Sequence, residues 1–447
     1  MKNVILIVLL FLSNFFIKAQ DNDLKLKDPN NLEWFKQARF GMFIHWGLYS
    51  VLEGSYKDRT MPDKSLPNGN SWYAEWIQAR LDIPAEEYKL MVNQFDPVLF
   101  DAEKWVLEAK NAGMNYMVIT AKHHDGFALW DSKVSDYDIM QTPYKKDILA
   151  EFVNACKKHG MKYGFYYSHW QDWEYPGGAL PNWCEKRSEA DFEKYWQEKS
   201  LPQIKELLIN YDPDLLWFDT WNEECHINPQ RRDQLIGMIR KYSSKCLING
   251  RISFFNPGDN IDYLEMNDNE YPKEMLSKPW QTPATMQNSW GFHAKDYNWK
   301  SSKEMLTYLI YNISKGGNYL LNIGPKADGT FPIMATRRLR EMGAWLFANN
   351  ESIYGTSPVN INLGDDVYLT QKKIGKEHYL YVFLTKPVSQ IKLPFHESKA
   401  TTVLETNRPL EGHMENGTFI VELPSDLFRD SSIQVLKINS SLKISQA

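Results

Sequence analysis

Cysteine is scarce in this sequence, which contains four cysteines among 447 residues. Cys156, Cys184, Cys225 and Cys246 are spaced too irregularly for a zinc site and too sparsely for a disulfide-based fold. An oxidising compartment would allow one or two disulfides. A chain of this length can bury a sizeable core without them.

The sequence also lacks an excess of positive charge. It contains 51 Lys and Arg residues and 56 Asp and Glu residues, which gives a formal net charge of -5. Such a chain presents no basic field for a polyanion, so we expect no nucleic-acid partner. Its substrate is not expected to be recognised by bulk charge.

Long apolar runs are missing after the N-terminus, where no stretch reaches the roughly 18 residues of a membrane span. We therefore expect no membrane insertion. The N-terminus itself combines Lys2, an apolar stretch from Val4 to Ile17 and small Ala19, as secretory signal peptides do. We expect residues 1–19 to be removed. With no cysteine near this point, a periplasmic or secreted protein is expected rather than a lipoprotein.

Aromatic residues, in contrast, are abundant. They make up 14% of the chain and include 16 Trp and 24 Tyr. Amphipathic rings suit the apolar faces of sugars, although cores and interfaces also use them. This feature alone is weak support for a carbohydrate ligand.

Short apolar runs alternate with helical patterns from about Glu33 to Asn350. The expected strands are 40–44, 116–120, 162–167, 215–218, 247–249, 262–265 and 319–323. The expected helices include 101–112, 147–159, 190–210, 231–242 and 302–314. This alternation predicts parallel strands in a (β/α)8-like barrel, the catalytic domain at residues 20–354.

The pattern changes after Gly355. Short alternating strands are expected at 367–373, 378–384, 390–393, 401–405, 417–423 and 433–438. Their spacing predicts a C-terminal β-sandwich at residues 355–447. This region has no cluster of catalytic residue types, so we favour support of the barrel over glycan contact.

Asp219 ends the run Leu215-Leu216-Trp217-Phe218, where a buried strand should emerge from the core. An unpaired buried charge is costly, and catalytic residues of parallel barrels lie at the carboxyl ends of strands. Asp219 is therefore a candidate nucleophile. A helix N-cap explains this strand end equally well, because Asp caps helices effectively.

Polar residues beside aromatics follow other strands too. They include His45, Glu75, Trp76, His123, His124 and Tyr166. Together they could bind sugar hydroxyls while a ring packs on the C–H face. His45, His123, His124 and Asp125 could instead bind a metal, but neighbours on an extended segment point to opposite sides.

A glycosidase commonly needs a second carboxyl group as proton donor. The segment after Ile261 offers Glu265, Asp268, Glu270 and Glu274, and spacing alone does not choose among them. Solvated loop carboxylates are the simpler explanation for each.

Six motifs in order carry a resemblance to a known family. They are FGMFIHWG around His45, YAEW at Glu75, KHHDGF at His123, YYS at Tyr166, LWFD at Asp219 and SWGF at Trp290. From about Trp34 to its end the chain resembles the α-L-fucosidases of glycoside hydrolase family 29. The resemblance implies a retaining exo-acting enzyme that uses no metal or cofactor and cleaves fucosylated oligosaccharides or glycoconjugates.

The resemblance also implies roles for individual residues. Asp219 matches the nucleophile. His45, Glu75, Trp76, His123, His124, Tyr166, Trp217 and Arg251 match residues that line the fucose pocket, and Trp290 matches an aromatic that packs near the sugar's methyl group. Glu270 is chosen as the acid/base.

One position departs from the family. A Trp-Glu pair precedes the SWGF-like motif in relatives, whereas this chain has Trp280-Gln281. The change removes an alternative acid and motivates a second hypothesis, a catalytically weak fucose-binding protein. A relaxed glycosidase acting on L-galactose-like sugars is a third. Loops 52–70, 173–187 and 222–229 are expected to contact the leaving group, while the oligomeric state stays open.

Overall fold

The computed structural model describes residues 24–221, 226–394, 398–428 and 432–440. The predicted signal peptide at residues 1–19 and Cys225 lie outside these ranges. Cys156, Cys184 and Cys246 are free thiols. Among the described helices, none is both long and apolar enough to span a membrane.

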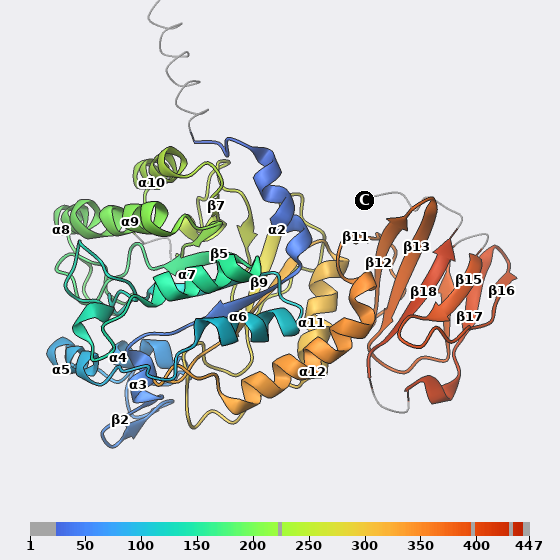
Figure 1. Ribbon diagram of the computed structural model, residues 1–447, viewed down its shortest axis with the longest axis horizontal. Coiled ribbons are helices and arrows are strands. Elements are labelled where there is room, and N and C mark those ends of the chain that lie inside the picture. The colour runs from blue at the N-terminus through green and yellow to red at the C-terminus, as the bar shows by residue number, and fades with distance from the viewer. Residues whose placement is uncertain (1–23, 222–225, 395–397, 429–431, 441–447) are drawn as a thin grey trace, which may run out of the picture.

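Eight parallel strands form the central sheet, in the order β7-β6-β5-β4-β1-β10-β9-β8. Figure 1 shows the C-terminal strands, such as β13 (Glu377–Leu384) and β18 (Gln434–Ser440), to one side of this sheet. The strands of the central sheet are β1 (Phe40–Ile44), β4 (Tyr116–Lys122), β5 (Lys162–Tyr167), β6 (Leu215–Trp217), β7 (Leu247–Ile248), β8 (Leu264–Glu265), β9 (Trp280–Thr285) and β10 (Asn318–Ile323). Strands covered on both faces need apolar residues throughout, which explains the continuous apolar runs. The predicted barrel-like sheet is confirmed.

Strand β9 has no counterpart among the sequence-based expectations. Gln281 and Thr282 interrupt its apolar pattern, and Pro283 argues against an inner strand because it donates no ladder hydrogen bond. In the structure Pro283 nevertheless lies opposite Leu320 of β10.

The two ends of the curved sheet meet at β7 and β8. In the described residues, a single parallel bridge between Asn249 and Tyr263 joins them. Backbone hydrogen bonds at this junction run from the Gly250 N–H to the Tyr263 carbonyl and from the Asp262 N–H to the Ile248 carbonyl, both at 2.9 Å. We call this junction the seam.

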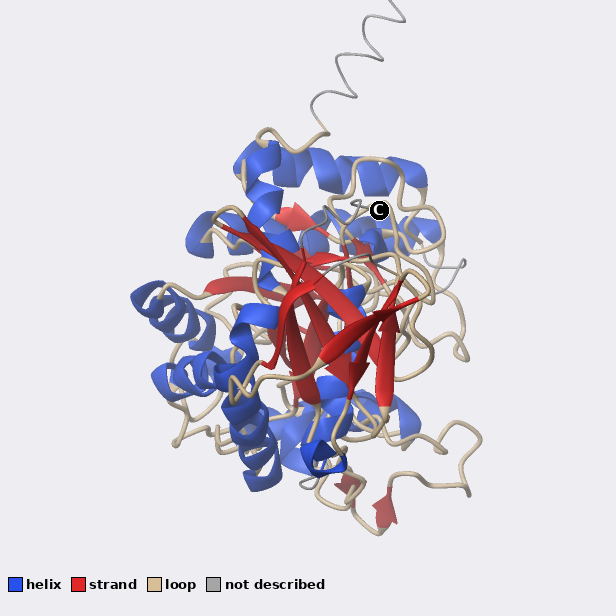
Figure 2. Cartoon of the chain, turned by 90° about the vertical axis from the view of Figure 1, so that its right-hand side faces the viewer, coloured by secondary structure: helices blue, strands red, loops and turns tan. Residues whose placement is uncertain are grey.

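Helices cover the outside of the sheet (Figure 2). The longer ones are α6 (Ala102–Asn111), α7 (Ile148–His159), α8 (Glu189–Tyr195), α9 (Leu201–Tyr211), α10 (Pro229–Tyr242), α11 (Ser302–Ser314) and α12 (Ile333–Asn349). Several begin with side-chain caps, such as Asp101 on α6, Asp147 on α7 and Ser301 on α11. The predicted helix 190–210 contains a π-helical turn, η5 (Trp196–Ser200), between α8 and α9.

Shorter elements fill the connections. The helical ones are η1 (Pro29–Leu32), α2 (Glu33–Ala38), α3 (Tyr49–Leu52), η2 (Ala74–Trp76), α4 (Ile77–Arg80), α5 (Ala85–Lys89), η3 (Leu90–Asn93), η4 (Ile139–Gln141), η6 (Gly250–Ile252), η7 (Asn350–Ser352) and η8 (Ser425–Phe428). Strands β2 (Ser55–Tyr56) and β3 (Arg59–Thr60) pair as a small hairpin.

The C-terminal region forms two antiparallel sheets, ordered β11-β12-β13-β18-β15 and β14-β17-β16. Their strands are β11 (Ser357–Pro358), β12 (Val367–Ile374), β13 (Glu377–Leu384), β14 (Gln390–Leu393), β15 (Ser398–Val403), β16 (Gly412–Glu415), β17 (Thr418–Glu422) and β18 (Gln434–Ser440). Leu380, Val382, Leu393 and Val421 share one core between the sheets, which confirms the predicted sandwich. The Trp345 indole of α12 donates to the Ile433 carbonyl and ties the sandwich to the barrel.

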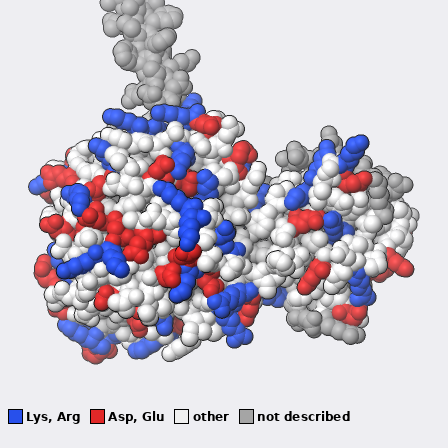
Figure 3. All heavy atoms as spheres, in the orientation of Figure 1, with Lys and Arg blue, Asp and Glu red and all other residues white. Residues whose placement is uncertain are grey.

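Acidic and basic side chains are interspersed over the face seen in Figure 3, with no large region of one sign. This distribution agrees with the nearly balanced composition.

Candidate active site

A cavity of about 440 Å³ opens where the barrel strands end. It is lined by Phe43, His45, Tyr73, Glu75, Trp76, Arg80, His123, His124, Asn182, Trp183, Trp217, Asp219, Trp221, Arg251, Asn267, Asp268, Glu270 and Trp290. All the predicted site residues except Tyr166 are in this lining. The expected leaving-group loop 52–70 contributes none, whereas 173–187 contributes Asn182 and Trp183.

Asp219 lies directly after β6, and its side chain is 13% exposed. Its Oδ1 accepts a hydrogen bond from Arg251 Nη1 at 3.0 Å, and its Oδ2 accepts one from the Tyr166 hydroxyl at 2.9 Å. Burial raises the pKa of Asp219, and these two donors act in the opposite direction. The carboxylate therefore has the partners that favour its charged form.

The N-cap explanation of Asp219 is wrong. The next described helix, α10, is capped by Asn228, whose side chain accepts from the Arg231 N–H at 2.9 Å. The chain between Asp219 and Asn228 is long enough to separate the strand-end acid from the helix start.

Arg251, in η6 after β7, is shared between two acids. Besides Asp219, it donates through Nη2 to Asp268 Oδ1 at 2.7 Å and to the Met266 carbonyl at 2.7 Å. Its guanidinium also lies over the Trp217 ring, 5.1 Å from the centroid. One cation thus connects the segments that follow β6, β7 and β8.

Tyr166 lies behind the cavity wall, fully buried at the end of β5. Its ring stacks on Trp217 with centroids 5.2 Å apart and on His123 with centroids 5.3 Å apart. Its position makes it a support for Asp219 instead of a lining residue.

His45 is neutral because burial lowers its pKa to about 3. The Asn322 amide donates to the Trp290 carbonyl, so its oxygen faces His45 Nδ1 at 2.7 Å and accepts the imidazole N–H. This arrangement leaves Nε2 of His45 as a hydrogen-bond acceptor. Asn322 was missed from the sequence, although a polar residue inside the apolar run of β10 is a usable signal.

His123 and His124 both line the cavity, with ring centroids 4.1 Å apart. The expectation that they point to opposite sides is wrong, because a turn at His124 and Asp125 replaces the extended chain after β4. Burial lowers the pKa of both imidazoles. The Ser168 hydroxyl donates to the Gln171 carbonyl at 2.8 Å, so it accepts from His124 Nδ1 at 2.7 Å and leaves Nε2 as an acceptor.

Glu75 is 2% exposed, and burial raises its pKa to about 7. Its Oε2 accepts the Gly291 N–H at 2.8 Å, which joins the YAEW and SWGF segments. The Trp290 ring lies 5.0 Å from the His45 ring and 5.9 Å from the Phe43 ring, between centroids. An apolar wall and a titratable carboxyl therefore share this side of the cavity.

The four candidate acids differ in whether they line the cavity. Asp268 and Glu270 line the cavity, whereas Glu265 and Glu274 do not. Asp268 is paired with Arg251, while Glu270 is exposed and accepts from the Asn267 amide at 2.7 Å.

Gln281 lies inside the barrel and is completely buried. Its amide nitrogen donates to Glu265 Oε2 at 2.8 Å, and its oxygen accepts from the Tyr116 hydroxyl at 2.7 Å. Gln281 therefore satisfies an interior carboxyl group and does not face the cavity.

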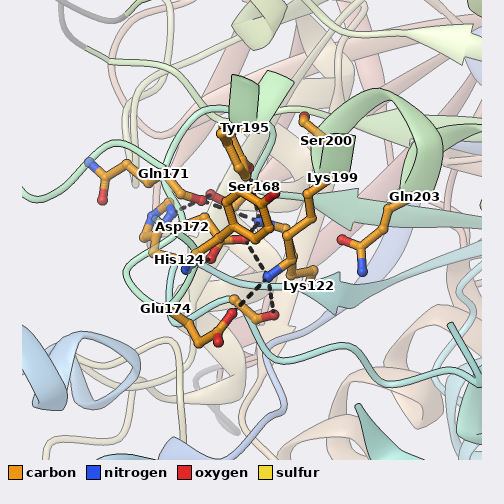
Figure 4. A network of polar contacts seen from close by, with 12 residues as sticks. Lys122, His124, Ser168, Gln171, Asp172, Glu174, Tyr195, Lys199, Ser200 and Gln203 are labelled. Carbon is orange, nitrogen blue, oxygen red and sulfur yellow. Dashed lines mark hydrogen bonds and ion pairs between the residues drawn. The ribbon is translucent and has the colours of Figure 1, made fainter. Parts of the chain in front are cut away.

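A buried charge network supports the turn that carries the two histidines (Figure 4). Lys122 and Lys199 reach the same Asp172 oxygen at 2.9 and 3.0 Å, and Lys199 also contacts Glu174 at 3.2 Å. Burial pushes the pKa of Asp172 up, but the two lysines outweigh it and lower the pKa to about 2. The π-helical turn η5 supplies Lys199, so this irregular turn serves the network.

Within the described residues, no group of three or more His, Cys, Asp or Glu side chains is arranged to hold a metal ion. Asn322 contacts His45, and Ser168 contacts His124, whose Nε2 also lies 3.4 Å from the Tyr166 hydroxyl.

Comparisons with known proteins agree with this geometry. The family model described as alpha-L-fucosidase matches residues 17–351. An alpha-L-fucosidase of Dictyostelium discoideum is 29% identical over 415 residues, 86% of this chain and 85% of that protein.

Solved structures are similar as well. Alpha-L-fucosidase isoenzyme 1 from Paenibacillus thiaminolyticus has a TM-score of 0.78 at 30% identity and covers 92% of this chain and 98% of its own. A Bacteroides thetaiotaomicron enzyme of glycoside hydrolase family 29, trapped as a covalent intermediate, has a TM-score of 0.80 at 27% identity and covers 93% and 96%. A family match over most of the chain, together with the catalytic cavity at the strand ends, shows that this chain is a glycoside hydrolase of the α-L-fucosidase family.

Proposed function

We propose that the chain is a retaining exo-α-L-fucosidase in which Asp219 is the nucleophile and Glu270 the acid/base. The observation that carries this proposal is the position of Asp219, a buried carboxylate at a strand end held by Arg251 and Tyr166. The covalent intermediate reported for the Bacteroides thetaiotaomicron enzyme supports a double displacement.

In the first step an Asp219 oxygen attacks the anomeric carbon of fucose, and the bond to the leaving oxygen breaks. Glu270 gives its proton to that oxygen. In the second step the Glu270 carboxylate takes a proton from water, whose oxygen attacks the same carbon and releases Asp219. Retention requires the two carboxyl groups to approach to about 5–5.5 Å.

Glu270 is the acid that the surroundings favour. Glu265 accepts a hydrogen bond from Gln281 inside the barrel, and Asp268 forms an ion pair with Arg251. Glu270 lines the cavity without a cationic partner among the described residues, and its contact is the neutral Asn267 amide. Protonation of Glu270 therefore breaks no ion pair.

The lining also suits a deoxy sugar. His45 and His124 line the cavity, and the unprotonated Nε2 of His45 can accept from a sugar hydroxyl, whereas Nε2 of His124 lies 3.4 Å from the Tyr166 hydroxyl. Trp290 and Phe43 offer an apolar surface for the methyl group, where the extra hydroxyl of L-galactose would lack a partner. We therefore propose terminal α-L-fucosyl residues as the substrate.

Asp219→Asn tests the nucleophile. The neutral amide is nearly the same size, so the fold should persist while kcat on 4-nitrophenyl α-L-fucoside falls by several orders of magnitude. Circular dichroism and thermal unfolding provide the control. Near-wild-type turnover would refute the assignment.

Glu270→Ala tests the acid/base. Proton donation matters most for poor leaving groups, so the loss should be larger on a fucosyl disaccharide than on the aryl fucoside, with partial rescue by azide. Asp268→Ala is the matched comparison in the same loop. Equal losses on both substrates for Glu270→Ala would exclude it as the proton donor.

We also propose export to the periplasm or the medium. The support is the layout of residues 1–19, with a charged start, an apolar centre and Ala19. Mass determination of the mature N-terminus in a secreting host tests this, and an intact Met1 in the mature protein would contradict it.

A further inference from the structure

The cavity extends past the residues that surround Asp219. Trp76 lies at the transition: its ring is 5.0 Å from that of His124 on the inner side and 5.7 Å from that of Trp183 on the outer side, between centroids. We call Trp183, Trp221, Asn182 and Arg80 the outer wall; all four line the cavity. An exo-acting enzyme binds fucose in the inner part, so the outer wall faces the leaving group.

The outer wall offers aromatic surface. Trp221 follows Asp219 by two residues, and its ring centroid lies 5.5 Å from that of Trp76 and 5.2 Å from that of His124. Trp183 is partly exposed, as are Trp76 and Trp221. Partly exposed indole rings at a cavity mouth can pack against the apolar face of a second sugar.

Arg80, at the end of α4, carries a charge that the chain leaves largely uncompensated. Its guanidinium lies 4.5 Å from the Trp183 centroid and 5.5 Å from the Trp76 centroid. Among the described residues it makes no ion pair, and its contact through Nη1 is the Asn68 carbonyl at 3.0 Å. Its Nε is buried without a hydrogen-bond partner.

Among the described residues, none of the carboxylates that line the cavity forms an ion pair with Arg80. Asp219 and Asp268 share Arg251, and Glu270 is bonded to Asn267. The acidic groups that face Arg80 are Tyr73 and Glu75, and Glu75 is tied to the Gly291 N–H. Neither approaches Arg80 closely enough to form an ion pair, so Arg80 keeps donors for a ligand.

The outer wall is also rich in donors. The indole N–H groups of Trp76, Trp183 and Trp221 belong to partly exposed rings that line the cavity. Indole and guanidinium groups donate hydrogen bonds and cannot accept them. A group with several acceptor oxygens and negative charge matches such a surface best.

We propose that the outer wall is a leaving-group subsite for a sugar that carries an anionic group, a carboxylate or a sulfate ester. The sugar ring packs on Trp183 and Trp221 while Arg80 binds the anionic oxygens. This inference rests on the proposed fucosidase activity and adds the class of leaving group.

The test compares fucosyl disaccharides of one cleavable linkage whose second sugar is glucose, glucuronic acid or 6-sulfated glucose. Charge-assisted hydrogen bonds from Arg80 should raise kcat/KM for at least one anionic substrate roughly 10- to 100-fold over the glucose compound. The two anionic substrates distinguish carboxylate from sulfate. The preference should shrink as salt is added.

Arg80→Met and Arg80→Lys identify the residue responsible. The Met variant should lose the anionic preference, and the Lys variant should retain part of it because the charge remains. α-L-Fucosyl fluoride, which has no leaving sugar, measures any disturbance of the inner site. The loss on the anionic disaccharide should exceed the loss on the fluoride at least tenfold.

The outcomes separate the two proposals. If the wild type hydrolyses α-L-fucosyl fluoride but shows no higher kcat/KM for the anionic disaccharides, the subsite assignment alone is overturned. An equal loss of kcat/KM on all substrates in Arg80→Met overturns it as well. No hydrolysis of the fluoride by the wild type would instead refute the fucosidase function on which the subsite rests.

Discussion

Replacing Arg251 by Met should make the nucleophile hard to ionise. Arg251 is the cation nearest to Asp219, with 3.0 Å between Nη1 and Oδ1, and it also neutralises Asp268 at 2.7 Å. Burial already raises the pKa of Asp219, and Arg251 opposes that effect. Without the guanidinium, Asp219 keeps its burial and gains the unscreened repulsion of Asp268.

The magnitude follows from the burial of the pair. Removing one partner of a buried ion pair typically costs about 3–5 kcal/mol. One pKa unit corresponds to about 1.4 kcal/mol, so the pKa of Asp219 should rise by about 2 or more. The nucleophile must be ionised, and the acid limb of the kcat/KM profile should therefore move to higher pH by about 2 units.

The assay is the pH dependence of kcat/KM for 4-nitrophenyl α-L-fucoside. Arg251→Lys keeps a charge and should shift the limb less than Arg251→Met. Tyr166→Phe removes one hydrogen bond to the carboxylate, worth about 1.5–3 kcal/mol, and should shift the limb in the same direction by about 1–2 pH units. An unchanged acid limb in Arg251→Met would refute the idea that this arginine keeps Asp219 charged.

Two further substitutions probe buried polar groups. Gln281→Glu would place two carboxyl groups in contact inside the barrel. The Tm should therefore fall, and the rate of disaccharide hydrolysis should not rise. Higher activity at an unchanged Tm would show that position 281 supplies a proton donor. Burial raises the pKa of Glu75 from 4.5 to about 7, so the unfolded chain loses this proton at lower pH than the folded one. Wild-type stability should then decline by up to about 3 kcal/mol between pH 4.5 and 7, and Glu75→Gln should remove that part of the decline. Urea unfolding at both pH values measures it, and equal declines in the two proteins would contradict the assignment.

The sequence located most of the site because parallel strands end at one face of a barrel. Asp219, His45 and His123 each follow an apolar strand, and that pattern is local. Asn322 went unnoticed because its role depends on an imidazole nitrogen contributed by a distant segment. Hydrogen bonds between segments on different strands of the barrel produce no periodic pattern in the sequence.

Other predictions failed because rules that hold for regular strands were applied to segments that are not regular. His123 and His124 were expected on opposite sides because alternation holds in extended strands, but the turn after β4 brings both rings to the cavity. Pro283 hid strand β9, since its missing N–H is tolerated in the ladder with β10. Gln281 was read as a lost acid because its burial could not be seen without that strand.

The seam gives Arg251 a second significance. The sheet ends meet there through the bridge between Asn249 and Tyr263, and Arg251 spans the same junction by binding Asp219, Asp268 and the Met266 carbonyl. Local opening at this point would separate the barrel ends and release the nucleophile's counter-ion in one event. Ionisation of Asp219 and closure of the barrel are therefore thermodynamically linked, so a ligand that favours the Asp219–Arg251 pair also protects the fold from opening at the seam.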